Sequence, residues 1–206
     1  MTRFRSDSLK SGSTSGPGPP WRVRLTPRQV AHARDVARIR QRNNVRDHRV
    51  ERYGHTGDPF LAHVHGAMGE KAVAVAFAIA WDGAIGDLSA RDVGALQVRT
   101  TTHRQGRLIL HPADQDGEAF ILAVLGGATA GYYLVELAGW IMARDGKVGE
   151  NWCDPTGRGR PAFFVPRAAL LPMSTVRPTG AAAEEKRAEQ KTPRGFGEPP
   201  ELDPLG

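Results

Sequence analysis

Residues 119–143, AFILAVLGGATAGYYLVELAGWIMA, contain two long apolar runs joined by a Gly-rich turn. Apolar runs that are rich in β-branched and aromatic residues and bounded by turn signals indicate strands. Since few polar residues interrupt them, we expect both faces of these strands to be covered. The stretch therefore predicts the centre of a sheet, with further structure packed on each side.

Shorter apolar or alternating segments surround this pair: ALQVRTT at 95–101, RLILH at 107–111 and AFFVP at 162–166. The turn-rich segments between them predict a meandering, antiparallel group of strands. Residues 60–81 are long, Ala-rich and apolar, and predict a buried helix that covers one face of the sheet. An Arg-rich helix or the short PRAALL turn could cover the other face. The expected class is α/β, with a mixed or antiparallel central sheet flanked by helices.

The length of 206 residues favours one folded core with tails. Residues 1–20 are rich in Ser, Gly and Pro, and cannot bury enough apolar surface to offset the entropy lost on ordering. Residues 174–206 have a similar composition with mixed charge. We expect a disordered N-terminal arm at 1–20, an α/β domain at 21–173 and a disordered C-terminal tail at 174–206.

No apolar segment is long enough to cross a membrane, and the N-terminus lacks the apolar stretch of a secretory signal. Cys153 is the only cysteine, which excludes an internal disulfide and a Cys-rich zinc module and is typical of a reducing compartment. The expectation is a soluble, cytoplasmic protein with no membrane partner.

The net charge is +6, and its excess lies near the front of the chain. Residues 21–52 contain ten arginines: Arg22, Arg24, Arg28, Arg34, Arg38, Arg40, Arg42, Arg46, Arg49 and Arg52. Thr26, Pro27 and Gln29 together are typical of a capped helix start. In that helix four arginines recur every four residues and share one face: Arg34, Arg38, Arg42 and Arg46. Because arginine makes paired hydrogen bonds to phosphate, this face predicts a nucleic-acid partner, and a merely solvated basic face is the alternative.

A second group of residues has the chemistry of a metal site. Glu70 lies on the predicted buried helix, just after Gly66 and Gly69, and Asp92 lies in the turn that enters strand 95–101. Gln97 and Arg99 are two residues apart on that strand, so they point to the same side of the sheet. Oxygen ligands with a nearby cation are what a magnesium-dependent nuclease requires.

The segments HVHGAMGE at 63–70 and GDLSARDVGALQVRTT at 86–101, with the strands that follow, resemble small phage-type proteins related to the PD-(D/E)XK, or restriction-endonuclease-like, nuclease superfamily. The resemblance covers about residues 26–173. It implies an α/β core with a mixed sheet and a Mg²⁺- or Mn²⁺-dependent DNA nuclease whose products carry a 5′-phosphate. It also implies a possible homodimer, and the host cytoplasm as the location of a phage-encoded protein.

By this resemblance, Glu70 matches the helix glutamate and Asp92 the metal-binding aspartate, with Asp87 as the alternative ligand. Gln97 stands at the acidic position of the E-x-K element and would offer a neutral carbonyl oxygen, while Arg99 stands at its lysine. Arginine keeps its proton, so Arg99 would stabilise charge and not act as a base. The residues placed to contact phosphates are Thr100, Thr101 and Arg104.

Two other functions fit the same features. One is a non-catalytic nucleic-acid-binding protein on the same fold, in which Gln97 and Arg99 mark a decayed site. The other is a structural or adaptor protein whose basic helix binds an acidic partner. A zinc site from His63, His65 and Cys153 is disfavoured, because two histidines two apart on a helix diverge and a fourth ligand is not evident.

Overall fold

The computed structural model describes residues 19–47, 58–83, 91–155, 157 and 159–178. In chain order its elements are β1 (Trp21–Leu25), α1 (Pro27–Arg46), α2 (Pro59–Ala76), β2 (Leu96–Thr101), β3 (Leu108–Leu110), β4 (Ala119–Thr129), β5 (Tyr132–Met142), α3 (Ala143–Gly146), η1 (Gly149–Asn151), β6 (Trp152–Cys153), β7 (Ala162–Val165), η2 (Arg167–Ala169) and η3 (Met173–Thr175). The prediction of an α/β class is confirmed, while the restriction-endonuclease-like core stays a prediction.

Within these ranges the main sheet has four strands in the order β1-β5-β4-β2. The long β4–β5 hairpin forms its centre, β1 pairs antiparallel with β5, and β2 runs parallel to β4. A second sheet has the order β3-β7-β6. The sheet is therefore mixed, as the sequence allowed, but the expected antiparallel meander is wrong. β3 leaves the main sheet because its side chains Leu108 and Leu110 bury themselves on the far face of the β4–β5 hairpin.

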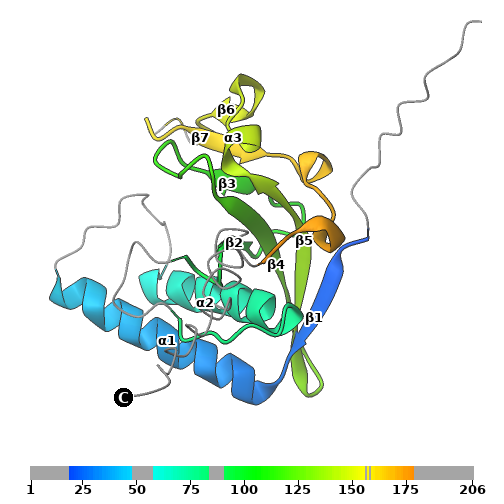
Figure 1. Ribbon diagram of the computed structural model, residues 1–206. Coiled ribbons are helices and arrows are strands. Elements are labelled where there is room, and N and C mark those ends of the chain that lie inside the picture. The colour runs from blue at the N-terminus through cyan, green and yellow to red at the C-terminus, as the bar shows by residue number, and fades with distance from the viewer. Residues whose placement is uncertain (1–18, 48–57, 84–90, 156, 158, 179–206) are drawn as a thin grey trace, which may run out of the picture.

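Apolar side chains cover both faces of the hairpin, as its sequence predicts. On one face Ile121, Ala123 and Leu125 pack with buried residues of α1 and α2. On the other face Phe120, Leu122 and Val124 pack with β3, β7 and the PRAALL segment, from which Leu170 is buried. Figure 1 shows α1 and α2 together on one side and β3, β6 and β7 on the other. The PRAALL turn thus helps cover the second face, whereas the Arg-rich helix lies on the same side as α2.

Gly69 allows α2 to pack directly on the sheet. A Cβ at this position would overlap Thr100 Oγ1 and lie 3.1 Å from the Cβ of Ala123. The close approach expected near this glycine is therefore present, whereas a Cβ at Gly66 would meet nothing within 4 Å. Because the backbone of α2 touches β2 and β4 at Gly69, the next residue, Glu70, is carried into the interior.

Three boundaries differ from the expectation. α2 ends at Ala76 and not at residue 81, because the backbone of Ala78 turns to a positive φ of 53°. Val23 and Leu25 alternate with exposed residues in β1, a strand that the sequence reading placed in no element. Residues 174–178 belong to the folded part, since Val176 is buried and the amide of Ala95 donates to the carbonyl oxygen of Pro178. The arm at 1–18 and the rest of the tail, 179–206, lie outside the described residues.

Candidate functional site

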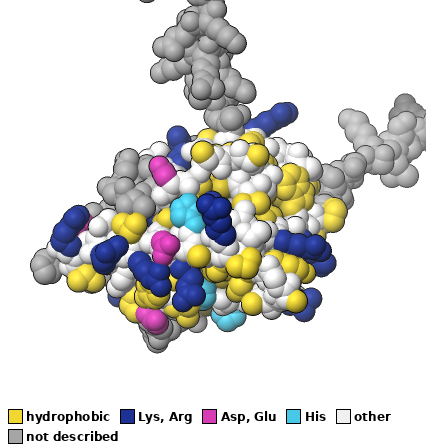
Figure 2. Space-filling model, turned by 90° about the horizontal axis from the view of Figure 1, so that it is seen from below, with side chains coloured by type: hydrophobic (Ala, Val, Ile, Leu, Met, Phe, Trp, Pro, Cys, Tyr) yellow, Lys and Arg dark blue, Asp and Glu magenta, His cyan; other side chains and the backbone are white. Residues whose placement is uncertain are grey.

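The exposed face of α1 carries the predicted row of arginines, which we call the arginine ridge: Arg34, Arg38, Arg42 and Arg46. Thr26 and Gln29 form the predicted capping box: the amide of Thr26 donates to Gln29 Oε1 at 2.8 Å, and the amide of Gln29 donates to Thr26 Oγ1 at 3.3 Å. The opposite face of the helix buries Ala33, Val36 and Ala37. As a result, four side chains face outward: Arg34, Arg38, Arg42 and Arg46. Figure 2, which views the molecule from the side of α1, shows basic side chains gathered on this face.

Two of these arginines form ion pairs with nearby acidic residues, one within a turn of α1 and one at its C-terminal end. Arg38 Nη1 lies 2.6 Å from Asp35 Oδ1, and their side chains are 56% and 62% exposed. Arg46 Nε lies 3.0 Å from Asp47 Oδ1. Exposed pairs of this kind contribute little to stability, so these arginines can exchange their partner for another anion at low cost.

Arg40 lies on the same helix but points inward, toward α2. Its Nη1 and Nη2 donate to Oε1 and Oε2 of Glu70, both at 2.7 Å, and its Nε and Nη2 donate to the carbonyl oxygen of Gly83 at 3.1 and 2.7 Å. Trp81 Nε1 adds a third hydrogen bond to Glu70, at 3.1 Å to Oε2. Glu70 is 4% exposed and is the one charged residue buried to this degree within the described ranges. The cluster therefore connects α1, α2 and the segment after α2 through one buried ion pair.

Asp92 lies close enough to this pair to interact with it electrostatically. Burial raises the pKa of Glu70 to about 7; the hydrogen bond from Arg40 opposes this shift and the charge of Asp92 adds to it. Burial also raises the pKa of Asp92, while the hydrogen bond from the Val98 amide, 2.7 Å from Asp92 Oδ2, opposes the rise. Asp92, at the entry of β2, and Glu70, on α2, are therefore near enough for the charge of Asp92 to disfavour ionisation of Glu70.

The raised pKa of Glu70 makes stability depend on pH. In the folded protein the Glu70 carboxyl group keeps its proton up to about pH 7, whereas in the unfolded chain it loses the proton near pH 4.5. The free energy of unfolding should therefore fall as the pH rises through this window. Asp92→Asn removes a charge that raises the Glu70 pKa, so we expect a shallower fall between about pH 5 and pH 8. Urea unfolding of both proteins across that range measures the slope of the free energy of unfolding against pH. Asp35→Asn, which removes an exposed carboxylate, should leave the slope unchanged; an equal slope in wild type and Asp92→Asn would contradict the coupling.

Gln97 and Arg99 share one face of β2, as their spacing predicts, but it is the face opposite Glu70. Leu96 and Val98 point into the core beneath α2, so the alternation of the strand turns the two polar residues to the other side. There Gln97 Nε2 donates to Glu118 Oε2 at 3.3 Å. Gln97 and Arg99 therefore lie on the face away from Glu70, while the charges of both Arg40 and Arg99 act on Asp92.

Arg99 has several partners on its side of the sheet. Its Nη2 lies 2.9 Å from Asp114 Oδ1, its Nε donates to the carbonyl oxygen of Ile109 at 3.3 Å, and its guanidinium lies 4.8 Å from the centre of the Phe120 ring. Asp114 Oδ2 also accepts from the amide of His111. Arg99 therefore ties β2 to β3 and to the turn that follows β3.

The three predicted phosphate contacts near β2 have different surroundings. Thr100 faces α2, and its buried Oγ1 has no hydrogen-bond partner within the described part of the chain, so it is not placed to contact phosphate. Thr101 Oγ1 accepts from the amide of His103 at 3.1 Å. Arg104 is exposed, which keeps its side chain accessible. Asp87, the alternative ligand, lies outside the described residues.

The predicted metal ligands have protein partners in this arrangement. Both oxygens of Glu70 accept hydrogen bonds from Arg40, and Asp92 Oδ2 accepts one from Val98. Among the described residues, no three His, Cys, Asp or Glu side chains are grouped so as to hold a metal ion. The residues of the zinc alternative also lie on different elements. His63 Nε2, on α2, is 3.1 Å from Asn44 Nδ2, while Cys153 is exposed on β6.

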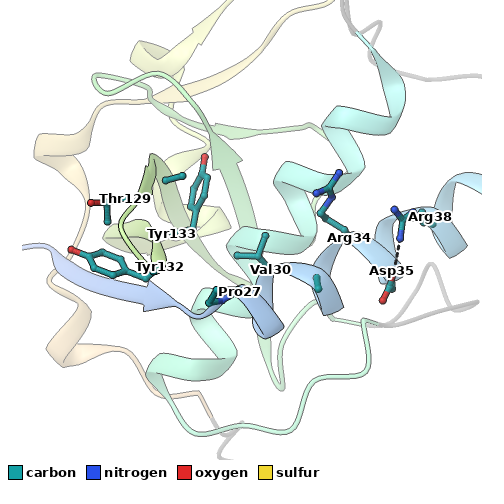
Figure 3. A pocket seen from close by; sticks show the side chains of 11 residues that line it. Pro27, Val30, Arg34, Asp35, Arg38, Thr129, Tyr132 and Tyr133 are labelled. Atoms are coloured by element: carbon teal, nitrogen blue, oxygen red, sulfur yellow. Dashed lines mark hydrogen bonds and ion pairs between the residues drawn. The ribbon is translucent and has the colours of Figure 1, made fainter.

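A pocket of about 430 Å³ lies beside the arginine ridge, between the first turns of α1 and the tip of the β4–β5 hairpin. Pro27 and Val30 of α1 and Tyr132 and Tyr133 of β5 form its apolar walls, and Arg34 and Arg38 lie at one side of it (Figure 3). The sequence reading did not single out the two tyrosines. The signal for them was a pair of aromatic residues directly after the Gly-rich turn.

Composition alone does not distinguish Arg40 from the other arginines of the N-terminal segment. Its position indicates a different role, because Arg40 is two residues from both Arg38 and Arg42 and so does not share the four-residue spacing of the exposed face.

No protein-family model, curated protein sequence or solved structure matches this chain. Within the described residues no helix is both long enough and apolar enough to span a membrane.

Proposed function

We propose that this protein binds nucleic acid through the outward face of α1. The observation that carries the proposal is the row formed by Arg34, Arg38, Arg42 and Arg46, all exposed on one side of a 20-residue helix. At a rise of about 1.5 Å per residue the row extends for about 18 Å, over which a nucleic-acid strand presents several phosphates. Arginine binds phosphate in a bidentate manner, so a helix held rigidly by its buried face can fix several of these contacts together.

The surroundings of Glu70 favour binding without hydrolysis. Glu70 already forms a bidentate pair with Arg40, and Gln97 and Arg99 are bonded to Glu118 and Asp114 on the far side of the sheet. The residues of the suspected nuclease motif thus have structural partners of their own. This matches the reading of a nucleic-acid-binding protein with a decayed site.

Salt-dependent binding of labelled oligonucleotides tests the proposal. We expect fluorescence anisotropy to show that the protein binds a DNA strand. A plot of log K for this binding against log salt concentration should have a negative slope of about 0.7 to 0.9 for each phosphate contacted. A titration with polyglutamate separates this function from recognition of acidic proteins. Binding of polyglutamate but of no DNA at low salt would favour the adaptor function and contradict our proposal.

A metal-dependent DNA nuclease is the second candidate. Burial raises the pKa of both Glu70 and Asp92, and the charge of Asp92 raises that of Glu70 further. This is the observation in its favour, because a nearby cation would stabilise both carboxylates. Two measurements test this candidate. Mn²⁺ is titrated calorimetrically into wild type and Asp92→Ala, and both proteins are then incubated with supercoiled and linear DNA. We expect no metal uptake and no cleavage. Uptake and cleavage in wild type that vanish in Asp92→Ala would establish the nuclease instead.

A further inference from the structure

The pocket beside the arginine ridge combines apolar walls with a basic side. Tyr132 and Tyr133 line it from the hairpin tip and Pro27 and Val30 from the start of α1, while Arg34 and Arg38 follow one and two turns along the helix. The two tyrosines are neighbours in β5, and their rings point in different directions (Figure 3). Asp35 also lines the pocket, and its ion pair with Arg38 offsets its charge. A ligand that fits such a site has a flat, apolar part for the walls and a negative group for the arginines.

Both tyrosines are held in place by other parts of the fold. The Arg24 guanidinium lies 4.9 Å from the centre of the Tyr132 ring, and both residues line a neighbouring hollow. Tyr133 pairs with Leu25 of β1 and packs against the main core. Aromatic rings fixed in this way lose little further freedom when a ligand stacks on them.

We propose that this pocket receives an unpaired base of a single-stranded nucleic acid, with the Tyr133 ring as the stacking surface and Arg34 and Arg38 as contacts to the flanking phosphates. The proposal rests on the function proposed above and names its substrate class. A base in a duplex is paired and stacked, so it can enter the pocket only if it is flipped out, at a cost in free energy. An already unpaired base enters without this cost, and base stacking on aromatic rings is tolerant of sequence.

A second aromatic hollow, at Trp152 and Phe163, is less suited to a base with its phosphate. The two rings lie 4.7 Å apart and pack on each other. The nearby Lys147 already donates to Asp116 Oδ1 at 2.9 Å and to the carbonyl oxygen of Pro112 at 3.2 Å. This hollow also lies on the second sheet, away from the arginine ridge, and it supplies a matched control.

The test compares a labelled 20-nucleotide single strand with the corresponding duplex in anisotropy titrations. Tyr133→Leu keeps apolar bulk but removes the ring, and it should weaken single-strand binding by about fivefold or more, with duplex binding changed less than about twofold. Tyr133→Phe should retain wild-type affinity, and Trp152→Leu should bind as wild type. Circular dichroism melting confirms that each variant is folded.

A crosslinking experiment on the wild-type protein gives a result that does not depend on the variants. A single strand with 5-iodouracil, irradiated in the complex and digested, should yield adducts on Tyr133 by mass spectrometry. Adducts only at other sites, or a folded Tyr133→Leu variant that binds the single strand as wild type does, would overturn the pocket while salt-dependent binding through α1 still stood. If wild type binds neither probe at low salt, the proposed function itself is wrong.

Discussion

Replacing the four arginines of the ridge on α1 by glutamine should weaken single-strand binding about 100-fold or more near 0.1 M salt. Each lost phosphate contact removes about 0.7 from the slope of log K against log salt, and four contacts together remove nearly 3. The variant changes Arg34, Arg38, Arg42 and Arg46, which are exposed and whose acidic neighbours form only surface pairs. Its thermal stability should therefore stay close to that of wild type, since surface substitutions of this kind have small effects.

The control for this variant removes the same number of charges elsewhere. The four exposed arginines chosen, away from α1, are Arg107, Arg144, Arg160 and Arg177. Since both variants have the same net charge, a general loss of electrostatic attraction would affect them equally. We expect the control to bind within a few-fold of wild type with a nearly unchanged salt slope. Equal losses in the two variants would mean that no defined arginine face exists.

The largest effect on stability is expected at Arg40. Arg40→Met leaves the Glu70 carboxylate buried with Trp81 as its remaining donor, and removing one partner of a buried ion pair costs about 3–5 kcal/mol. Urea unfolding at about pH 8 should show this loss in the free energy of unfolding. At about pH 5 the loss should be smaller, because protonation of Glu70, whose pKa is about 7, removes the buried charge.

A double variant distinguishes an unpaired charge from a packing defect. Adding Glu70→Leu to Arg40→Met removes the stranded carboxylate, so part of the stability should return even though Gly83 and Trp81 lose their partner. If Arg40→Met alone costs less than about 1 kcal/mol at pH 8, water reaches Glu70 and the pair is not structural. In that case Glu70 would be available to other ligands, and the nuclease candidate would gain support.

Much of the fold follows from patterns within short segments. The capped start of α1 depends on Thr26, Pro27 and Gln29, and a four-residue spacing is enough to place the arginines on one face. The apolar runs in β4 and β5 predict strands covered on both sides, and the structure covers them on both sides. In each case the deciding interactions join residues close in sequence, or follow from hydrophobic content alone.

Partners across long sequence distances could not be predicted in this way. The spacing of Gln97 and Arg99 shows that they share a face, but which face meets α2 depends on where the helix packs. Arg40 and Glu70 are 30 residues apart, and nothing local to either residue identifies the other. The parallel pairing of β2 with β4 and the transfer of β3 to a second sheet likewise depend on competition among all strands for the same apolar surface.

The sequence by itself thus determined the α/β class, the capped basic helix and the apolar hairpin, because local backbone preferences and hydrophobic periodicity specify them. Only the tertiary structure decided that Glu70 pairs with Arg40, that Gln97 and Arg99 turn away from it, and that Tyr132 and Tyr133 lie beside the arginine ridge. The physical reason is that such contacts are set by the packing of whole elements, which buries one face of each and thereby selects the partners of every polar side chain.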